Sequence, residues 1–179
     1  MDYKDVARAK LFAIQIHSGH FRKASKDMYV HHLFRIEGFL TKHFNHLKNI
    51  EELKIAAILH DAIEDTWVTK DIIKQKFSKK VADLVDSLSK LHSHKSYLEI
   101  LKESTDEVKL IKLIDIYDNI YDGFEGPKWP LFIKDSKEII LALNVSNKEF
   151  KKEFDQIKKE ALQKIELELS RWNKKQHQT

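Results

Sequence analysis

Apolar residues recur every three or four positions along most of this chain, with polar and charged residues between them. That spacing gathers apolar side chains on one face of a helix, whereas a strand would need strict alternation. Glycine and proline, which interrupt helices, occur only four times and twice in 179 residues. We therefore expect an all-α protein with helices over about 3–18, 30–45, 50–65, 79–91, 95–103, 106–121, 131–144 and 147–173.

Local signals refine some of these boundaries. Thr69 precedes an apolar-periodic segment and is expected to be the N-cap of a further short helix. Ser146 is followed three positions later by Glu149, the pattern of a capping box, which predicts the start of the last helix. The stretch "DGFEGPKWP", 122–130, is the strongest loop signal. Since there is no internal repeat and no linker, residues 1–179 are expected to form a single domain.

The last predicted helix carries a continuous apolar stripe, which has two interpretations. Packing against the core is the usual one, and contact with a partner helix in a homo-oligomer is the other. The residues of the stripe are Phe150, Phe154, Ile157, Ala161, Ile165, Leu169 and Trp172.

Composition narrows the class of protein. Charged residues make up 34% of the chain and apolar residues 42%, which is the balance of a globular protein. No apolar run is long enough to cross a bilayer and no signal peptide is recognisable, so we expect no membrane partner and a cytoplasmic location. The absence of cysteine excludes disulfides and zinc–thiolate sites. A net charge of +4 does not call for nucleic acid, but it favours a small anionic ligand.

The segment "AAILHDAIEDT", 56–66, ends an apolar helix with four ionisable groups. On a helix, His60 and Asp61 can both reach one point beside the axis, a combination that suits Mn, Fe, Zn or Mg, in that order of preference. Glu64 and Asp65 follow one turn later and are candidates for handling a proton. A helix that ends in a solvated acidic turn has the same pattern, and it is the commoner explanation of an isolated pair.

Two further segments supply partners for that pair. "YVHHLFRIEGFL", 29–40, places two histidines at the start of an apolar helix. "VKLIKLIDIYDNIYD", 108–122, places Asp115 inside an apolar run, where a carboxylate is costly unless it is paired or bound to a metal. Capping of this carboxylate by backbone, arginine or lysine is the alternative. One histidine from 31–32 together with Asp115 would complete a site of two histidines and two aspartates.

Five motifs in order resemble the HD-domain phosphohydrolases, and more narrowly the hydrolase domain of the RelA/SpoT alarmone family with its small single-domain members. The agreement in order and spacing extends over about residues 5 to 122 and is far more specific than any one motif. The motifs are "HSGHFRK" at 17–23, "YVHHL" at 29–33, "ILHDAIEDT" at 58–66, "LSKL" at 88–91 and "IKLIDIYDN" at 111–119.

The resemblance implies a bundle of about ten helices and a bound metal, usually manganese. It also implies hydrolysis of guanosine tetra- or pentaphosphate at the 3′-pyrophosphate, which releases pyrophosphate, with Glu64 and Asp65 supporting the attacking water. Small members of the family also remove the 2′-phosphate of NADPH. The implied metal ligands are His32, rather than His31, with His60, Asp61 and Asp115.

For the substrate, the resemblance implies contacts from four residues. Arg22 would pack on the base, Lys23 would help with charge or the ribose, and Asn119 would contact the nucleotide. Lys90 is a weaker candidate that could be a surface lysine, and the Arg-Lys pair could be a solvated basic turn.

The sequence departs from the family pattern near the substrate. Ile116 replaces an arginine and Asp118 a histidine, and Asp122 stands where basic or hydroxyl residues often follow. This wall is therefore expected to carry more negative charge than usual, which puts the purine and 5′-phosphate contacts in doubt. Lys134 and Lys137 could reach the 5′-phosphates, although the pattern there is too loose to place them.

The sequence thus predicts a metal-dependent hydrolase whose partner is a small phosphorylated nucleotide. One alternative is an HD phosphohydrolase of another nucleotide, such as a ppApp-type nucleotide, NADPH, a nucleoside monophosphate or a cyclic nucleotide. A module that binds an alarmone without cleaving it is a second alternative, and a purely structural helical protein is a third.

Overall fold

A computed structural model describes the chain except residues 1–2, 24, 90–96, 123–127 and 177–179. In the described part the regular elements are all helices, apart from one isolated bridge between Phe21 and Met28. The predicted all-α class is confirmed, while the single domain over 1–179 stays a prediction. The helices are α1 (Tyr3–Ile16), α2 (Tyr29–Phe44), α3 (Ile50–Ile58), α4 (Ala62–Asp65), α5 (Lys70–Lys76), α6 (Lys79–Leu88), α7 (Tyr97–Glu103), α8 (Asp106–Asp122), α9 (Trp129–Ala142) and α10 (Lys151–Gln176).

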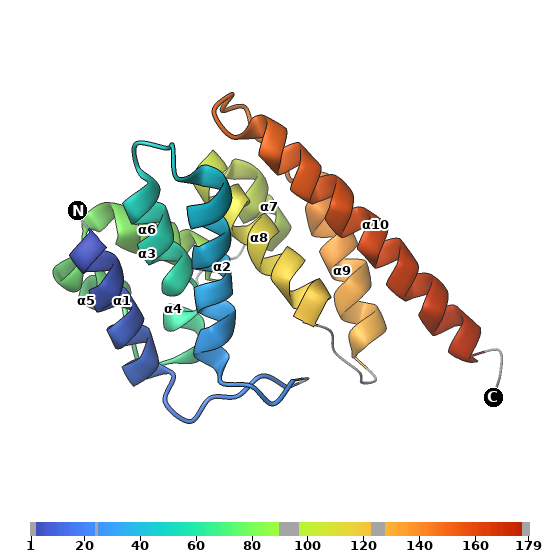
Figure 1. The fold of residues 1–179 in the computed structure, drawn as a ribbon, viewed down its shortest axis with the longest axis horizontal. Helices are drawn as coiled ribbons and strands as arrows, with labels where there is room; N and C mark the ends of the chain where they lie inside the picture. Colours follow the sequence, from blue (N-terminus) through green and yellow to red (C-terminus); the bar gives the residue numbers. More distant parts are fainter. Residues whose placement is uncertain (1–2, 24, 90–96, 123–127, 177–179) are drawn as a thin grey trace.

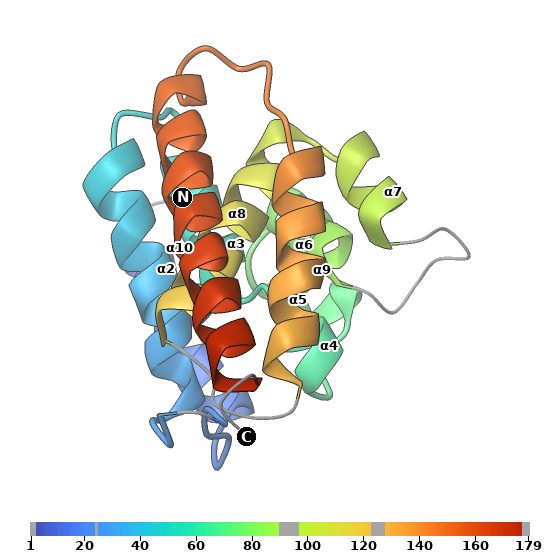
Figure 2. The ribbon, with the colours of Figure 1, turned by 90° about the vertical axis from the view of Figure 1, so that its right-hand side faces the viewer.

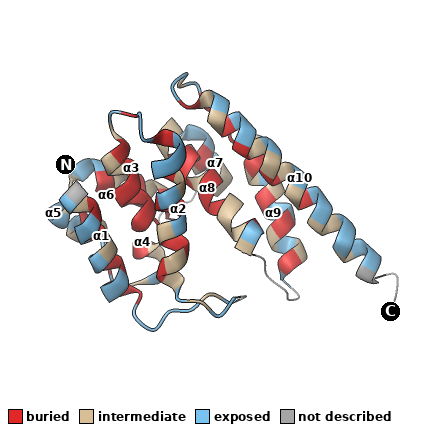
Figure 3. Cartoon of the chain, in the orientation of Figure 1, coloured by how far each residue is buried: buried red, intermediate tan, exposed pale blue. Residues whose placement is uncertain are grey.

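Two helices organise the packing. Helix α3 lies among α1, α2 and α6, and its side chains Leu53, Ile55 and Ile58 are fully buried. Helix α8 lies between this group and the pair α9–α10, which covers its other side (Figures 1 and 2). The buried faces of both groups meet around α3 and α8 (Figure 3). Because burial of apolar surface is the main favourable term in folding, these two helices are where substitutions should cost most.

The predicted helix over 50–65 is wrong in one respect, because it is broken into α3 and α4. Leu59 has φ −107° and ψ 7°, and Asp61 has φ −98° and ψ 2°, which is the bridge region rather than the α region. In the turn between the helices, His60 Nδ1 lies 2.9 Å from the carbonyl oxygen of Ala57, so the side chain helps to cap the end of α3. His60 and Asp61 therefore lie in a turn and not on a helix face.

One predicted helix start is confirmed and one is wrong. The Thr69 hydroxyl accepts a hydrogen bond from an amide in the first turn of α5, as expected of an N-cap. Ser146, by contrast, is not the cap of α10, because its amide and hydroxyl donate to the carboxylate of Asp106 at 2.8 and 3.0 Å. The side chain of Asn147 instead accepts from the amide of Glu149 at 2.9 Å. A long-range contact with α8 has thus displaced the local capping box.

Two further predictions concern the start of α9 and the apolar stripe on α10. Trp129 and Pro130, predicted to end a loop, form the first turn of α9, a position that suits proline because it lacks an amide proton. The first part of the stripe on α10, from Phe150 to Ile165, is buried, and α10 packs against α8 and α9. The core-packing interpretation is therefore confirmed for those residues. None of the described helices has both the length and the apolar character that a bilayer span requires.

Candidate metal and substrate site

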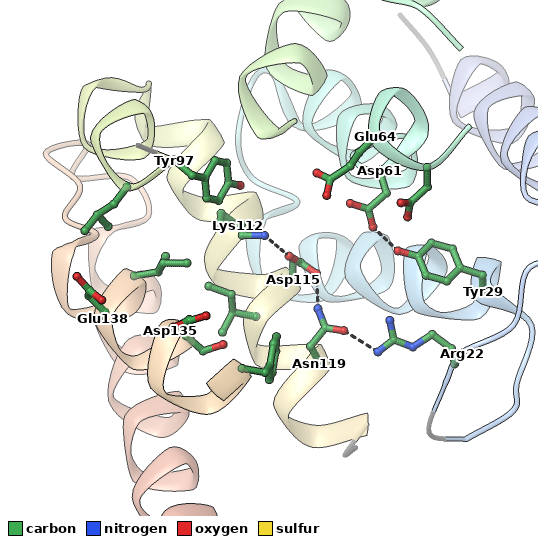
Figure 4. Close-up of a pocket in the computed structure, with 16 residues that line it drawn as sticks. Arg22, Tyr29, Asp61, Glu64, Tyr97, Lys112, Asp115, Asn119, Asp135 and Glu138 are labelled. Atoms are coloured by element: carbon green, nitrogen blue, oxygen red, sulfur yellow. Dashed lines mark hydrogen bonds and ion pairs between the residues drawn. The ribbon is translucent and has the colours of Figure 1, made fainter. Parts of the chain in front are cut away.

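A pocket of about 570 Å³ lies between two walls (Figure 4). One wall comes from the loop before α2, from α2, from the turn between α3 and α4, from α4 and from α8, and it includes six of the residues predicted from the sequence. These are Arg22, Asp61, Glu64, Asp65, Asp115 and Asn119. The other, called the distal wall below, consists of Tyr97 and Leu98 of α7 and Phe132, Asp135, Ser136, Glu138 and Ile139 of α9.

His60 presents one ring nitrogen to the site and uses the other for structure. Its side chain is 2% exposed, and Nδ1 donates to the carbonyl of Ala57. The lone pair of Nε2 therefore faces the site, where Nε2 lies 2.8 Å from Asp61 Oδ2. Asp61 also accepts a short hydrogen bond from the hydroxyl of Tyr29 (Figure 4). The turn between α3 and α4 thus fixes the orientation of both side chains.

His32, in the first turn of α2, is held in the same way. Its Nδ1 lies 2.7 Å from Asp118 Oδ2, which leaves Nε2 directed at Asp115, with Nε2 and Oδ1 3.2 Å apart. The same Oδ1 of Asp115 lies 3.6 Å from His60 Nε2. The four predicted metal ligands therefore lie together, although they come from α2, the α3–α4 turn and α8. His31 is not part of the group, because its Nδ1 pairs with Asp27 at 2.8 Å.

The chemistry of these residues fits a divalent cation. Nε2 of His32 and Nε2 of His60 are both buried and make no hydrogen bond with the described residues. Such orphaned atoms are rare, because a buried polar group without a partner is costly. Burial by itself would lower the pKa of His60, yet Asp61 and Asp115 raise that pKa well above its ordinary value. The negative field that favours a proton on His60 equally favours a cation between the four side chains.

Asp118 has a different place from the one predicted. It does not line the pocket but lies behind His32. Its carboxylate also accepts hydrogen bonds from Nε and Nη2 of Arg35, both at 2.8 Å. A carboxylate on the outer nitrogen fixes the tautomer and orientation of a ligating histidine, and Asp118 is placed to do this for His32 in the candidate metal site. The expectation that Asp118 adds negative charge to the substrate wall is wrong.

We expect Asp118→Asn to weaken metal binding by about 10- to 100-fold, because the amide holds the His32 ring less firmly. Competition against a chromophoric chelator measures this. Asp27→Asn is the matched control, since it removes the carboxylate that pairs with His31, the neighbour of His32 on α2, and neither residue lines the pocket. Equal affinity for manganese in the two variants would contradict the role given to Asp118.

The predicted substrate residues are only partly brought together. Arg22 lines the pocket, with Nη2 2.6 Å from Asn119 Oδ1, and Asn119 in turn donates to Asp115 at 2.6 Å (Figure 4). Lys23 is exposed and does not line the pocket, and Lys90 lies outside the described residues.

A further departure from the family pattern, Asp122, forms an ion pair with Arg22. Its Oδ2 lies 2.9 Å from Arg22 Nε, and Asp122 is absent from the pocket lining. Like Asp118, it therefore lies outside the pocket lining, and its charge is paired with that of Arg22. The contact ties the loop before α2 to the end of α8 and holds Arg22 in the lining of the pocket.

Glu64 and Asp65 both line the pocket, one turn beyond Asp61. Burial, together with the charges of Asp61 and Glu64, raises the pKa of Asp65. A carboxylate with a raised pKa is a better proton acceptor, so the surroundings of the pair fit the predicted role, which stays a prediction.

Three further residues of the site were missed. Lys112 lines the pocket, and its Nζ lies 2.8 Å from Asp115 Oδ2. Tyr29 reaches Asp61, and His17 is buried beside Tyr29, where burial lowers the pKa of His17 to about 4. Lys112 precedes Asp115 by three positions, the helical spacing that would have revealed it. Tyr29 precedes His32 by the same spacing.

Comparisons with known proteins agree with this geometry. A family model described as "HD domain" matches residues 9–113. The chain is 32% identical over 101 residues to a guanosine-3′,5′-bis(diphosphate) 3′-pyrophosphohydrolase of Borreliella burgdorferi, and 29% identical over 113 residues to a GTP pyrophosphokinase of Myxococcus xanthus. These alignments cover 56% and 63% of this chain, but only 14% of either relative.

A solved structure described as a metazoan ortholog of SpoT that hydrolyzes ppGpp has a similar fold. The TM-score is 0.73 at 22% sequence identity, and the match covers 89% of this chain and 97% of the other. The fold is therefore shared over nearly the whole length of both chains.

Proposed function

Because the chain belongs to the HD-domain family, we propose that it is a metal-dependent phosphohydrolase that removes the 3′-pyrophosphate from guanosine tetra- or pentaphosphate, leaving GDP or GTP. The observation that carries this proposal is the meeting of two buried histidine nitrogens, Nε2 of His32 and of His60, with the carboxylates of Asp61 and Asp115 at one wall of a pocket of about 570 Å³. The pyrophosphohydrolase named among the relatives supports the choice of substrate.

We propose manganese as the cation, with iron, zinc or magnesium as alternatives. When bound, such a cation supplies Lewis-acid chemistry, since it polarises a phosphoryl oxygen and lowers the pKa of a water molecule. His32, His60 and Asp61 can each offer a ligand atom within 4.8 Å of the others. Oδ1 of Asp115 lies 3.2 Å from Nε2 of His32 and 3.6 Å from Nε2 of His60, which supports Asp115 as the proposed fourth ligand.

The protein groups perform the rest of the reaction. Glu64 or Asp65 accepts a proton as water attacks the phosphorus, and the bond to the 3′-oxygen breaks. The ammonium of Lys112, beside Asp115, lies where charge develops on the phosphoryl oxygens. Arg22 and Asn119 hold the nucleoside at the mouth of the pocket.

Incubation of the protein with Mn²⁺ and guanosine tetraphosphate tests the proposal, with GDP and pyrophosphate as the measured products. We expect turnover that a chelator abolishes and added Mn²⁺ restores. Hydrolysis of NADPH or of another nucleotide instead would reject the substrate but keep the enzyme class. Binding of guanosine tetraphosphate without cleavage would favour the non-catalytic module.

A further inference from the structure

Helix α9 presents its acidic side chains to the pocket and its basic side chains elsewhere. Asp135 and Glu138 line the pocket, whereas Lys134 and Lys137 do not. Successive residues of a helix point about 100° apart, so the lysines that alternate with these acids belong to other faces. Lys137 reaches Glu166 of α10 at 3.4 Å, and Lys134 is exposed. At the distal wall the pocket is therefore lined by the carboxylates of α9, and not by Lys134 and Lys137, the residues that the sequence suggested as contacts for 5′-phosphates.

The proposed reaction fixes which end of the substrate meets this wall. The phosphorus under attack must lie near Asp61 and Asp115, and Arg22 borders the same side of the pocket. Figure 4 shows Asp135 and Glu138 across the pocket from that group. A nucleotide that places its 3′-pyrophosphate at the metal ligands and its base against Arg22 therefore extends its 5′ end toward α9.

The charges along this path are unequal. Among the residues that the structure describes, the cations that line the pocket are Arg22 and Lys112, which lie opposite α9 and are each bound to a carboxylate of α8. Among the residues that the structure describes, no lysine, arginine or histidine forms an ion pair with Asp135 or Glu138. A 5′-diphosphate would thus face two carboxylates, which are exposed at the wall, and like charges held a few ångströms apart repel one another.

On the basis of the proposed function, we infer that the distal wall makes the number of 5′-phosphates a determinant of specificity. The favoured substrates are guanosine 3′-diphosphates whose 5′ end carries a hydroxyl or a single phosphate. A 5′-hydroxyl can donate a hydrogen bond to a carboxylate, whereas each added phosphate brings more negative charge toward Asp135 and Glu138. Catalytic efficiency should therefore decrease from the 5′-monophosphate to the tetraphosphate and again to the pentaphosphate.

The test measures kcat/KM for these three substrates, all with the same 3′-diphosphate, in the wild type and in the double variant Asp135→Asn/Glu138→Gln. In the wild type we expect kcat/KM to decrease by about tenfold for each 5′-phosphate added, which corresponds to about 1.4 kcal/mol. The double variant keeps the shape of the wall without its charge, so it should flatten this series and improve pentaphosphate hydrolysis most. Glu153→Gln/Asp155→Asn on α10 removes the same charge outside the pocket lining and should leave the series as steep as in the wild type.

The outcomes separate the inference from the proposed function. A wild-type preference for the pentaphosphate, or a series equally steep in the wild type and in the α9 variant, would overturn the inference while hydrolysis itself stands. Flattening by the α10 control as much as by the α9 variant would overturn it too, because net charge and not the wall would then be responsible. Failure to hydrolyse any of the three substrates would reject the proposed function and the inference that rests on it.

Discussion

Asp61→Ala should abolish binding of the divalent metal and slow hydrolysis by about 10³-fold or more. Asp61 Oδ2 lies 2.8 Å from His60 Nε2, so its removal takes away one of the two carboxylates that would balance a cation between the histidines. In the wild type, Mn²⁺ at about 100 times its Kd should add about 2.7 kcal/mol to the free energy of unfolding. For a chain of this size that is a rise in Tm of about 5–10 °C. The variant should show no rise.

Glu37→Gln is a suitable control, because it changes a buried carboxylate that pairs with Lys10 on α1 and lies outside the pocket lining. It should lose some stability but keep the manganese-dependent rise in Tm. If Asp61→Ala bound manganese and turned over substrate like the wild type, the assignment of the metal site would be wrong.

Glu64→Gln should leave metal binding intact and lower kcat by about 10²- to 10⁴-fold, the usual contribution of a positioned general base. Glu64 lines the pocket but is not among the side chains that converge on the metal position. The amide has nearly the same shape and no basic oxygen, so KM should change little. Metal content and steady-state kinetics on the same preparation separate the two effects.

Comparison of Asp65→Asn with Glu64→Gln shows which carboxylate of the pair accepts the proton. If Asp65 is the proton acceptor, its variant should lose the larger factor in kcat and Glu64→Gln the smaller one. The exposed Asp71→Asn on α5 serves as the control for loss of a surface charge. Full activity in both Glu64→Gln and Asp65→Asn would remove the pair from the mechanism.

The sequence identified side chains that the structure brings together as a candidate metal site, because each of its signals is local. A carboxylate within the apolar run around Asp115, and histidines next to apolar helices, are unusual enough to stand out in one chain. The choice of His32 over His31 came from the family pattern, and the structure agrees, because His31 points to Asp27.

The parts that the sequence did not predict depend on contacts between distant segments. The break at Leu59–Asp61 reflects burial of His60 against the core, and helical spacing alone gives no sign of it. Asp118 was assigned to the wrong surface, because the direction of its side chain depends on the rotation of α8 relative to α2. Arg35 of α2 forms an ion pair with this carboxylate. The start of α10 was misplaced for the same reason, since Asp106 competes for the amide of Ser146.

The way Arg22 is held has a consequence for the entropy of binding. Its Nε and Nη2 contact Asp122 and Asn119, its side chain is only 15% exposed, and its Cζ lies 5.8 Å from the centre of the Tyr29 ring. A free arginine side chain carries about 2 kcal/mol of rotamer entropy, which a ligand normally has to overcome. Here that entropy is lost when the chain folds. A purine that stacks on the guanidinium therefore meets a surface that is already ordered, and more of its contact energy remains as affinity.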